Sequence, residues 1–259
     1  MDLFSFDPAV MMSFLLTLFR ISLVLFLLPF FGGIGVPNVI KAALCLVLTL
    51  AVWPALSFDG SYMPNHPFQL VLLIGGEILI GLGLGLLVRI LFAAVQMGGQ
   101  ILGFQMGFAM INVVDPMTGT NAAITSHFLY MTTLLVFLTL NGHLFLLSGL
   151  AESFSIIPPG GIVLNPLLGD TMLDYAGQIF VLAIKIAAPV SAAIFLVDLA
   201  LALVGRASPQ MNVLILGFPL KIAVGFFFLG IIFKTLSLYT QNFIIDLKSM
   251  FTTVLGAMS

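Results

Sequence analysis

The sequence predicts an all-α, polytopic membrane protein, because charges are rare, hydropathy is high and long apolar runs follow one another. Only 18 of the 259 residues are charged (7 %), 61 % are hydrophobic, and the mean hydropathy is +1.25. Soluble domains carry about 25 % charged residues and need them for a polar surface. The composition therefore excludes most soluble enzymes, and the net charge of −2 gives no basic face for nucleic acid.

Six apolar runs are each long enough to cross about 30 Å of hydrocarbon, which takes about 20 helical residues. Turn sequences rich in glycine and proline separate several of them. The runs do not alternate as strands of a barrel would, and a backbone in lipid must satisfy its own hydrogen bonds, so we expect helices. The predicted segments are 9–31, 38–58, 68–97, 122–150, 177–204 and 213–245.

Prolines and charges interrupt these runs. Pro219 predicts a kink or break in the last one, because proline removes a helical hydrogen bond. Glu77, Lys185 and Asp198 lie within predicted spans, where a charge costs about 2.5–3.5 kcal/mol and needs a partner or water. We expect partners from other helices, other subunits or a wet cavity, unless these side chains snorkel to an interface.

Residues 97–121, predicted to connect two spans, do not read as an ordinary solvated loop. Glycine, methionine and phenylalanine alternate there with amides, and Asp115 is the only charge. Gly99, Gly103 and Gly107 repeat at four-residue spacing, which gives a small helix face for close packing. The stretch is either helix packing inside the protein, with methionine filling gaps, or a seal that deforms around a passing object.

No motif for catalysis or for a cofactor stands out. The chain has no GxxxxGK[ST] phosphate loop, no HExxH and no GxSxG; its three histidines are scattered, and it has one cysteine. We therefore predict a non-enzymatic protein without a cofactor or metal.

Short motifs follow one another in a fixed order along nearly the whole chain. Among them are NVVDP (112–116) and RASPQMNV (206–213). The others are Arg20 with 29–33 and 35–37, then 98–100, 105–108, 141–143, 153–160, 198–202 and 217–221. In this order the motifs are similar to those of the FliR family of flagellar biosynthetic proteins, the R subunits of the type III secretion export gate.

This resemblance implies a subunit in the bacterial inner membrane at the flagellar basal body. Its partners would be FliP- and FliQ-type subunits, an FlhB-type switch protein and other export apparatus components, in a helical hetero-oligomeric channel for unfolded flagellar proteins. It also implies a P-like half (1–176, including a gate loop at 97–121) and a Q-like helical hairpin (177–259). Counterparts in virulence-type injectisomes are similar enough to fit as well.

The resemblance also assigns roles to residues. The family's constricting loop corresponds to 104–121, which implies a sealing role for Phe104, Gln105, Met106, Gly107, Phe108, Met110, Asn112, Asp115 and Pro116. The connection between the last two helices implies subunit contacts for Arg206, Pro209, Gln210, Asn212, Pro219 and Lys221. The alternative is a small-solute secondary transporter that uses Glu77, Lys185 and Asp198 as coupled charges.

Overall fold

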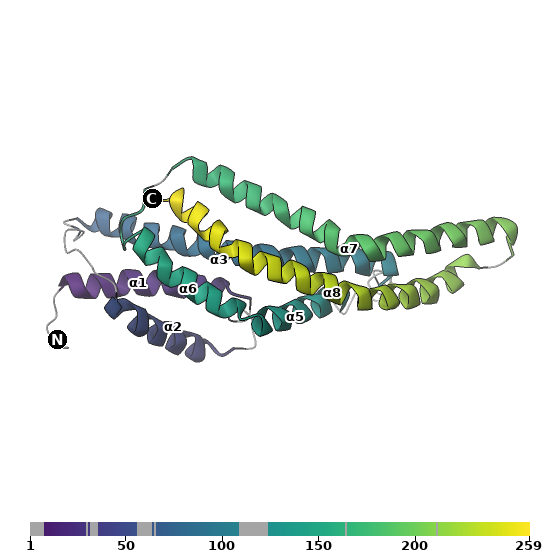
Figure 1. Cartoon of the computed structure of the whole chain (residues 1–259), viewed down its shortest axis with the longest axis horizontal. Helices are drawn as coiled ribbons and strands as arrows, with labels where there is room; N and C mark the ends of the chain where they lie inside the picture. Colours follow the sequence, from purple (N-terminus) through teal and green to yellow (C-terminus); the bar gives the residue numbers. More distant parts are fainter. Residues whose placement is uncertain are drawn as a thin grey trace. The chain divides into compact units, whose positions relative to one another are not determined.

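The computed structural model describes residues 8–29, 31, 36–55, 64, 66–108, 124–163, 165–210 and 212–259. These residues are predominantly helical, and the described part of the chain contains no strand, which confirms the all-α prediction (Figure 1). The elements are α1 (Pro8–Leu27), α2 (Asn38–Val52), the 3₁₀ turn η1 (Trp53–Ala55), α3 (Pro67–Met106), α5 (Ile124–Thr139), α6 (Gly142–Ile156), α7 (Leu167–Ala207) and α8 (Val213–Gly256).

The chain divides into two compact units. Unit 1 comprises residues 1–89, 141–175 and 244–259, and unit 2 comprises 90–140 and 176–243. The long helices α3, α7 and α8 each contribute one part to either unit.

Glycines of α3 set the packing of unit 1. A Cβ built on Gly81 would lie 2.8 Å from Cβ of Leu23, and one on Gly85 would lie 2.6 Å from Cβ of Leu27. Both partners belong to α1, so two glycines four residues apart let the α1 backbone approach α3 closely, as small-xxx-small pairs do in membranes. Gly83, between them, faces Met258 at the end of the chain instead, where a Cβ would lie 3.0 Å from the Met258 methyl carbon.

Unit 2 is built on an aromatic cluster and a second glycine contact. The Phe92 ring of α3 meets Tyr130 and Phe137 of α5 edge-on, with both centroid distances at 5.6 Å. On α3, Gly98 lies against α7: its Cβ position is 3.0 Å from the Ala183 carbonyl oxygen.

Four helices are long and apolar enough to cross a membrane, by length and composition: α1, α3, α7 and α8. The broken pair α5 and α6 passes the same test only when taken together, and α2 is a shorter apolar helix. These findings, within the part of the chain that the structure describes, confirm a polytopic membrane protein.

Several predicted boundaries were wrong, for local reasons. The second helix ends at Val52 because the 3₁₀ turn Trp53–Ala55 follows, and Pro54 within it has no N–H to donate. The fourth segment is two helices, since Asn141 adopts the left-handed conformation (φ 57°) and precedes Gly142.

Other segments are longer than expected. α7 begins at Leu167, where the Asn165 side chain accepts a hydrogen bond from the Leu167 amide (3.1 Å) and Pro166 directly precedes the helix. A kink or break was expected at Pro219; there is no break, since α8 continues from Val213 to Gly256 with this proline near its start. Pro189 is likewise inside α7.

Candidate functional site

The residues predicted to seal a conduit begin in the last turns of α3, which belong to unit 2. Residues 97–106 are helical rather than a connection, so the predicted end of this helix, at residue 97, was too early. The helix stops at Gly107, whose φ of 90° is one that side-chain-bearing residues rarely adopt. The Phe108 amide donates to the Gly103 carbonyl (3.0 Å) and the Gly107 amide to the Phe104 carbonyl (3.1 Å), which is the hydrogen-bond pattern of a Schellman motif.

Met106 fills the space left by a glycine of α8. Its side chain is fully buried (0 % exposed), and a Cβ built on Gly225 would lie 2.6–2.8 Å from its Cε, Cγ and Sδ atoms. Any side chain at 225 would therefore displace the thioether. Met106 thus packs directly against the α8 backbone at Gly225.

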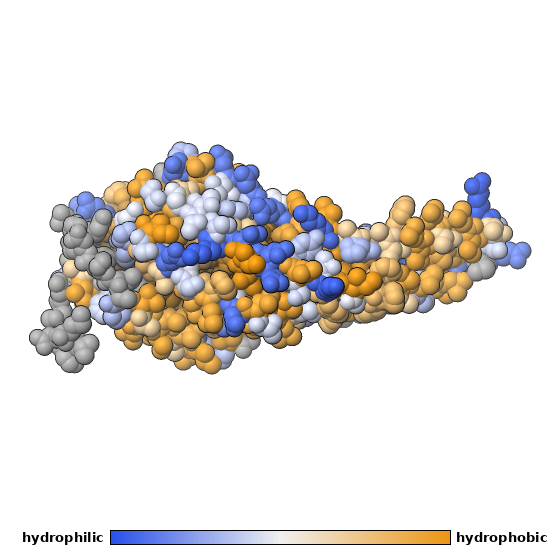
Figure 2. Space-filling view, viewed as in Figure 1, coloured by the Kyte–Doolittle hydropathy of each residue, from blue (hydrophilic) through white to orange (hydrophobic). Residues whose placement is uncertain are grey.

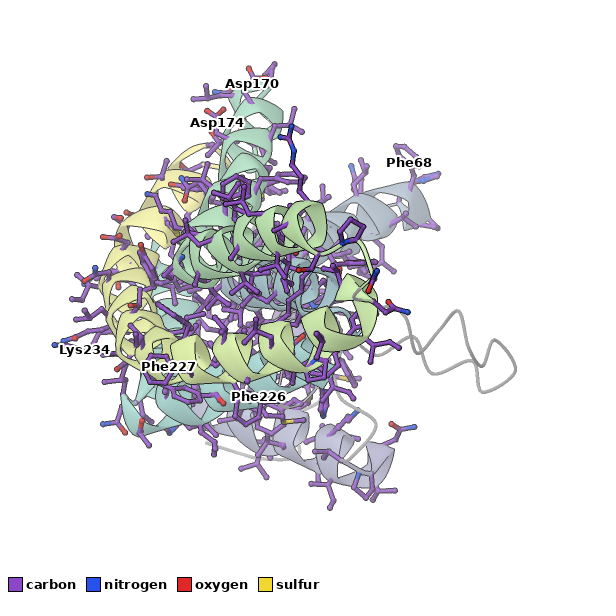
Figure 3. The ribbon with its side chains drawn as sticks, turned by 90° about the vertical axis from the view of Figure 1, so that its right-hand side faces the viewer. Phe68, Asp170, Asp174, Phe226, Phe227 and Lys234 are labelled. Atoms are coloured by element: carbon purple, nitrogen blue, oxygen red, sulfur yellow. The ribbon has the colours of Figure 1, made fainter. Side chains whose placement is uncertain are left out.

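Two phenylalanines of α8 cover the turn that follows. The Phe218 ring lies where a Cβ on Gly107 would be, at 2.6 Å, and the Phe108 ring meets Phe226 edge-on at 6.3 Å. Figure 3 shows Phe226 and Phe227 side by side on the α8 ribbon, and Phe227 is itself exposed. The start of the predicted gate loop thus packs on an aromatic surface of α8.

Phe104 and Gln105 behave differently from their neighbours. Phe104 is 73 % exposed, so most of its side chain lies outside the packed interior of unit 2. The side-chain oxygen Oε1 of Gln105 is buried without a hydrogen-bond partner among the described residues. The remaining predicted gate residues, Met110, Asn112, Asp115 and Pro116, lie outside the described residues.

The beginning of α5 is tied to the same end of α3. The Thr125 hydroxyl donates to the Gly99 carbonyl (2.8 Å) and the Ser126 hydroxyl to the Gln96 carbonyl (2.9 Å). Gly99 makes this approach possible, because a Cβ there would lie 2.5 Å from Cα of Ser126. The helix that follows residues 109–123, α5, is therefore anchored on the last turns of α3, the helix that precedes them.

The three glycines predicted to form one small helix face have different surroundings in the structure. Gly99 contacts α5, whereas Gly107 lies beyond the helix against Phe218 of α8. Gly103 is buried and supplies the carbonyl of the helix-ending motif.

The residues predicted to contact other subunits lie on the α7–α8 hairpin. Lys221 forms an ion pair with Asp198 of α7, so its partner comes from the same chain. Arg206, Pro209, Gln210 and Asn212 are exposed at or beside the turn. This hairpin is hydrophobic over most of the face shown in Figure 2, with hydrophilic residues at its turn. Its exposed large side chains include Phe195, Leu196, Leu199, Leu203, Ile215, Leu216, Phe226 and Phe227.

A buried ion pair in unit 1 was missed by sequence reasoning. Arg20 of α1 and Glu77 of α3 are both 0 % exposed; the Arg20 Nε–Glu77 Oε2 distance is 2.6 Å and the Nη2–Oε1 distance 3.1 Å. Arg20 Nη1 also donates to the carbonyl oxygens of Ser153 (3.2 Å) and Ile157 (3.0 Å). The Gly160 amide donates to Glu77 Oε1 (2.9 Å). One network therefore joins α1, α3, α6 and the turn after α6.

These pairs bear on the transporter alternative. Glu77 is neutralised by Arg20, Asp198 by Lys221, and Lys185 is exposed. Two of the three charges proposed for coupling thus have cationic partners of their own. Within the described residues no group of three or more histidine, cysteine, aspartate or glutamate side chains is placed to hold a metal ion.

The helices and their packing define a polytopic α-helical membrane protein. Residues 11–247 match the family described as "Bacterial export proteins, family 1", and the chain belongs to this family.

Curated relatives are similar over most of their length. The chain is 37 % identical over 241 residues to the flagellar biosynthetic protein FliR of Bacillus subtilis, covering 89 % of each chain. It is 29 % identical over 239 residues to FliR of Escherichia coli K12, covering 92 % of this chain and 91 % of that relative. It is also 32 % identical over 197 residues to Yop proteins translocation protein T of Yersinia pestis, covering 74 % and 73 %. The resemblance to the FliR family is thereby confirmed.

Proposed function

We propose that this chain is a non-enzymatic subunit of the flagellar type III protein export gate in the bacterial inner membrane. It assembles with FliP- and FliQ-type subunits and an FlhB-type switch protein into a channel for unfolded flagellar proteins. Flagellar export is favoured over the injectisome because the match to the B. subtilis flagellar protein has higher identity and covers more of both chains than the match to the Yersinia translocation protein.

The observation that carries the sealing role is the way the end of α3 is held. Met106 is buried against Gly225, the Gly107 turn is covered by Phe218, and α5 returns to Gly99 through Thr125. The described residues on both sides of this segment are therefore held at the last turns of α3. Methionine and phenylalanine at its base are deformable and apolar, which suits a seal that excludes ions and yields to a passing chain.

The lengths of α7 and α8 support assembly with other subunits. Exposed large hydrophobic residues run from Leu167 to Val204 on α7 and from Ile215 to Ile245 on α8. At 1.5 Å per residue these distances are about 56 and 45 Å, against about 30 Å of hydrocarbon. Tilts of ordinary size do not close this gap. Apolar surface of other proteins would cover the remainder.

Deleting residues 106–110 tests the sealing role. We expect the export complex still to assemble, because the exposed apolar surfaces of α7 and α8 remain, while the membrane becomes leaky to small ions. Assembly is measured by co-purification with the unlike small membrane subunits, and leakage by ion conductance of the purified complex in planar bilayers.

Point variants give the matched control. Met106→Ala opens the buried contact with Gly225 and should raise conductance, whereas Met11→Ala, at an exposed methionine of α1, should not. Unchanged conductance of an assembled complex with the deletion would refute the sealing role. Purification of the chain only as a stable homodimer would refute membership of the gate.

A further inference from the structure

A groove of about 190 Å³ runs between α6 and the last turns of α8, inside unit 1. The buried side chains of Leu247, Phe251 and Leu255 line it from α8. On α6, Gly149 leaves room for the Phe251 ring, which a Cβ there would meet at 2.6 Å. An apolar cavity of about 150 Å³ accepts benzene, so the groove has room for a small group of about eight non-hydrogen atoms.

Two opposite charges face each other across this groove. The distance from Lys248 Nζ to Glu152 Oε2 is 3.6 Å, and their side chains are 68 % and 43 % exposed. A charge-assisted hydrogen bond is about 2.7–2.9 Å long, so this pair is close without being locked together. The ammonium has three donors and the carboxylate several acceptor sites, and most of this capacity is open to a ligand.

Two hydroxyl groups add acceptors. Ser148 donates to the Phe145 carbonyl (2.9 Å) and Thr252 to the Ser249 carbonyl (2.9 Å), both within their own helices. A hydroxyl has one hydrogen, so both offer lone pairs to the groove that they line. The groove thus presents a cation beside a carboxylate and two neutral acceptors.

The surfaces of both helices change from apolar to polar at this groove. The last large hydrophobic side chains that they expose are Phe145 on α6 and Ile245 on α8. Farther along, the exposed positions are Ser148, Ala151, Glu152 and Ser155 on α6, and Asp246, Lys248, Ser249, Thr252, Thr253 and Gly256 on α8. Both helices run toward the same end of unit 1 (Figure 1). Such a change is expected at the level of the lipid headgroups, where hydrocarbon gives way to the polar region.

We propose that this groove binds the headgroup of a zwitterionic phospholipid that carries a primary ammonium, a phosphatidylethanolamine. Its phosphate accepts hydrogen bonds from Lys248, and its ammonium donates to Glu152 and the hydroxyls of Ser148 and Thr252. The acyl chains continue over the exposed Phe145. A trimethylammonium headgroup has no N–H to donate, and a phosphoglycerol headgroup brings no cation to Glu152, so both bind more weakly.

The test uses the full chain, purified in detergent and stripped of lipid. Binding of short-chain phosphatidylethanolamine, phosphatidylcholine and phosphatidylglycerol is measured by native mass spectrometry. We expect phosphatidylethanolamine to bind at least about fivefold more tightly than the other two. Glu152→Gln and Lys248→Gln should each weaken it about tenfold through loss of a charge-assisted hydrogen bond. Lys234→Gln, at an exposed lysine of α8 outside the groove, should leave it unchanged (Figure 3).

A charge reversal separates lipid recognition from a merely structural ion pair. The double variant Glu152→Lys with Lys248→Glu keeps the pair but exchanges the two ends of the site. We expect its lipid-free melting temperature to match the parent while selective binding is lost. The proposal is overturned if the three lipids bind equally, or if the reversed variant binds like the parent. It is also overturned if a photo-cross-linker at Ser148 in native membranes captures a protein instead of phospholipid. None of these outcomes depends on the sealing role.

Discussion

Replacing Glu77 by glutamine will destabilise unit 1 strongly, because it leaves the Arg20 guanidinium buried without a counter-charge. Both side chains are 0 % exposed, and two hydrogen bonds of 2.6 and 3.1 Å join them. Glutamine has nearly the same volume as glutamate, so no cavity forms and the loss is electrostatic. It retains one carbonyl oxygen that can accept from Arg20 or from the Gly160 amide.

The size of the effect follows from this geometry. Removing one partner of a buried ion pair costs about 3–5 kcal/mol in the free energy of unfolding. Because glutamine retains one acceptor oxygen, we expect a cost at the lower end of this range, about 3 kcal/mol. Arg20→Met removes the cation and also leaves the Ile157 carbonyl oxygen without its donor, whereas the Ser153 carbonyl still accepts from the Ile157 amide (2.9 Å). The double variant, Arg20→Met with Glu77→Gln, leaves no buried charge. Its residual cost is about 1–2 kcal/mol for backbone groups left without a partner, less than either single change.

Unfolding in mixed micelles with increasing sodium dodecyl sulfate measures these differences. The single tryptophan is a suitable probe, because Trp53 donates to Ser13 Oγ (2.8 Å) and stacks edge-on with Phe14 in unit 1. Asp174→Asn, at an exposed position of α7, is the control and should change stability by less than about 0.5 kcal/mol. A loss below about 1 kcal/mol for Glu77→Gln, or additive effects in the double variant, would refute the reasoning.

The same unfolding titration, followed by far-ultraviolet circular dichroism for the two variants in unit 2, checks three smaller predictions. Gly85→Ala should destabilise the protein, because its Cβ would collide with Leu27. Gly75→Ala, in the same helix, places a Cβ that meets nothing within 4 Å and should stabilise the protein by up to about 1 kcal/mol. Equal effects of the two substitutions would contradict the packing of α1 on α3. Gly107→Ala should cost at least about 1 kcal/mol, since its φ is 90° and the Phe218 ring occupies the space; a neutral result would argue against the helix-ending turn. Thr125→Val should cost about 0.5–1 kcal/mol by removing one interhelical hydrogen bond, and no loss would mean that this contact does not hold α5.

The number and kind of helices could be predicted from the sequence because the apolar runs are long and the charges few. The ends of the helices could be predicted only where the sequence contains a capping or helix-ending residue. Asn165 and Pro166 form such a signal, a capping side chain and a proline directly before the helix, and they explain why α7 begins before the predicted residue 177. Hydropathy alone overlooks it, because Asp170 and Asp174 in the first turns lower the average.

The sequence predicted that charges within apolar runs need partners, but it did not identify the partner residues. Position within apolar runs showed that Glu77 and Asp198 need partners from elsewhere. Nothing in their spacing points to Arg20 and Lys221, because each pair joins two helices whose register depends on tertiary packing. Lys221 illustrates the consequence. The structure pairs this lysine with a carboxylate of its own chain, and its predicted contact with another subunit stays a prediction.

The composition of residues 97–121 indicated two alternatives, internal helix packing and a deformable seal. The structure shows helix packing for the first part of the stretch, and the seal stays a prediction. Up to Met106 the residues pack as a helix, with Gly99 and Gly225 each removing a side chain where a neighbour comes close. At Gly107 the helix must stop. Rigid packing before this point is what a seal requires, because a segment that deforms around a passing chain returns to one closed state only if its base stays in place. The glycines that favour packing therefore support the sealing role and do not compete with it.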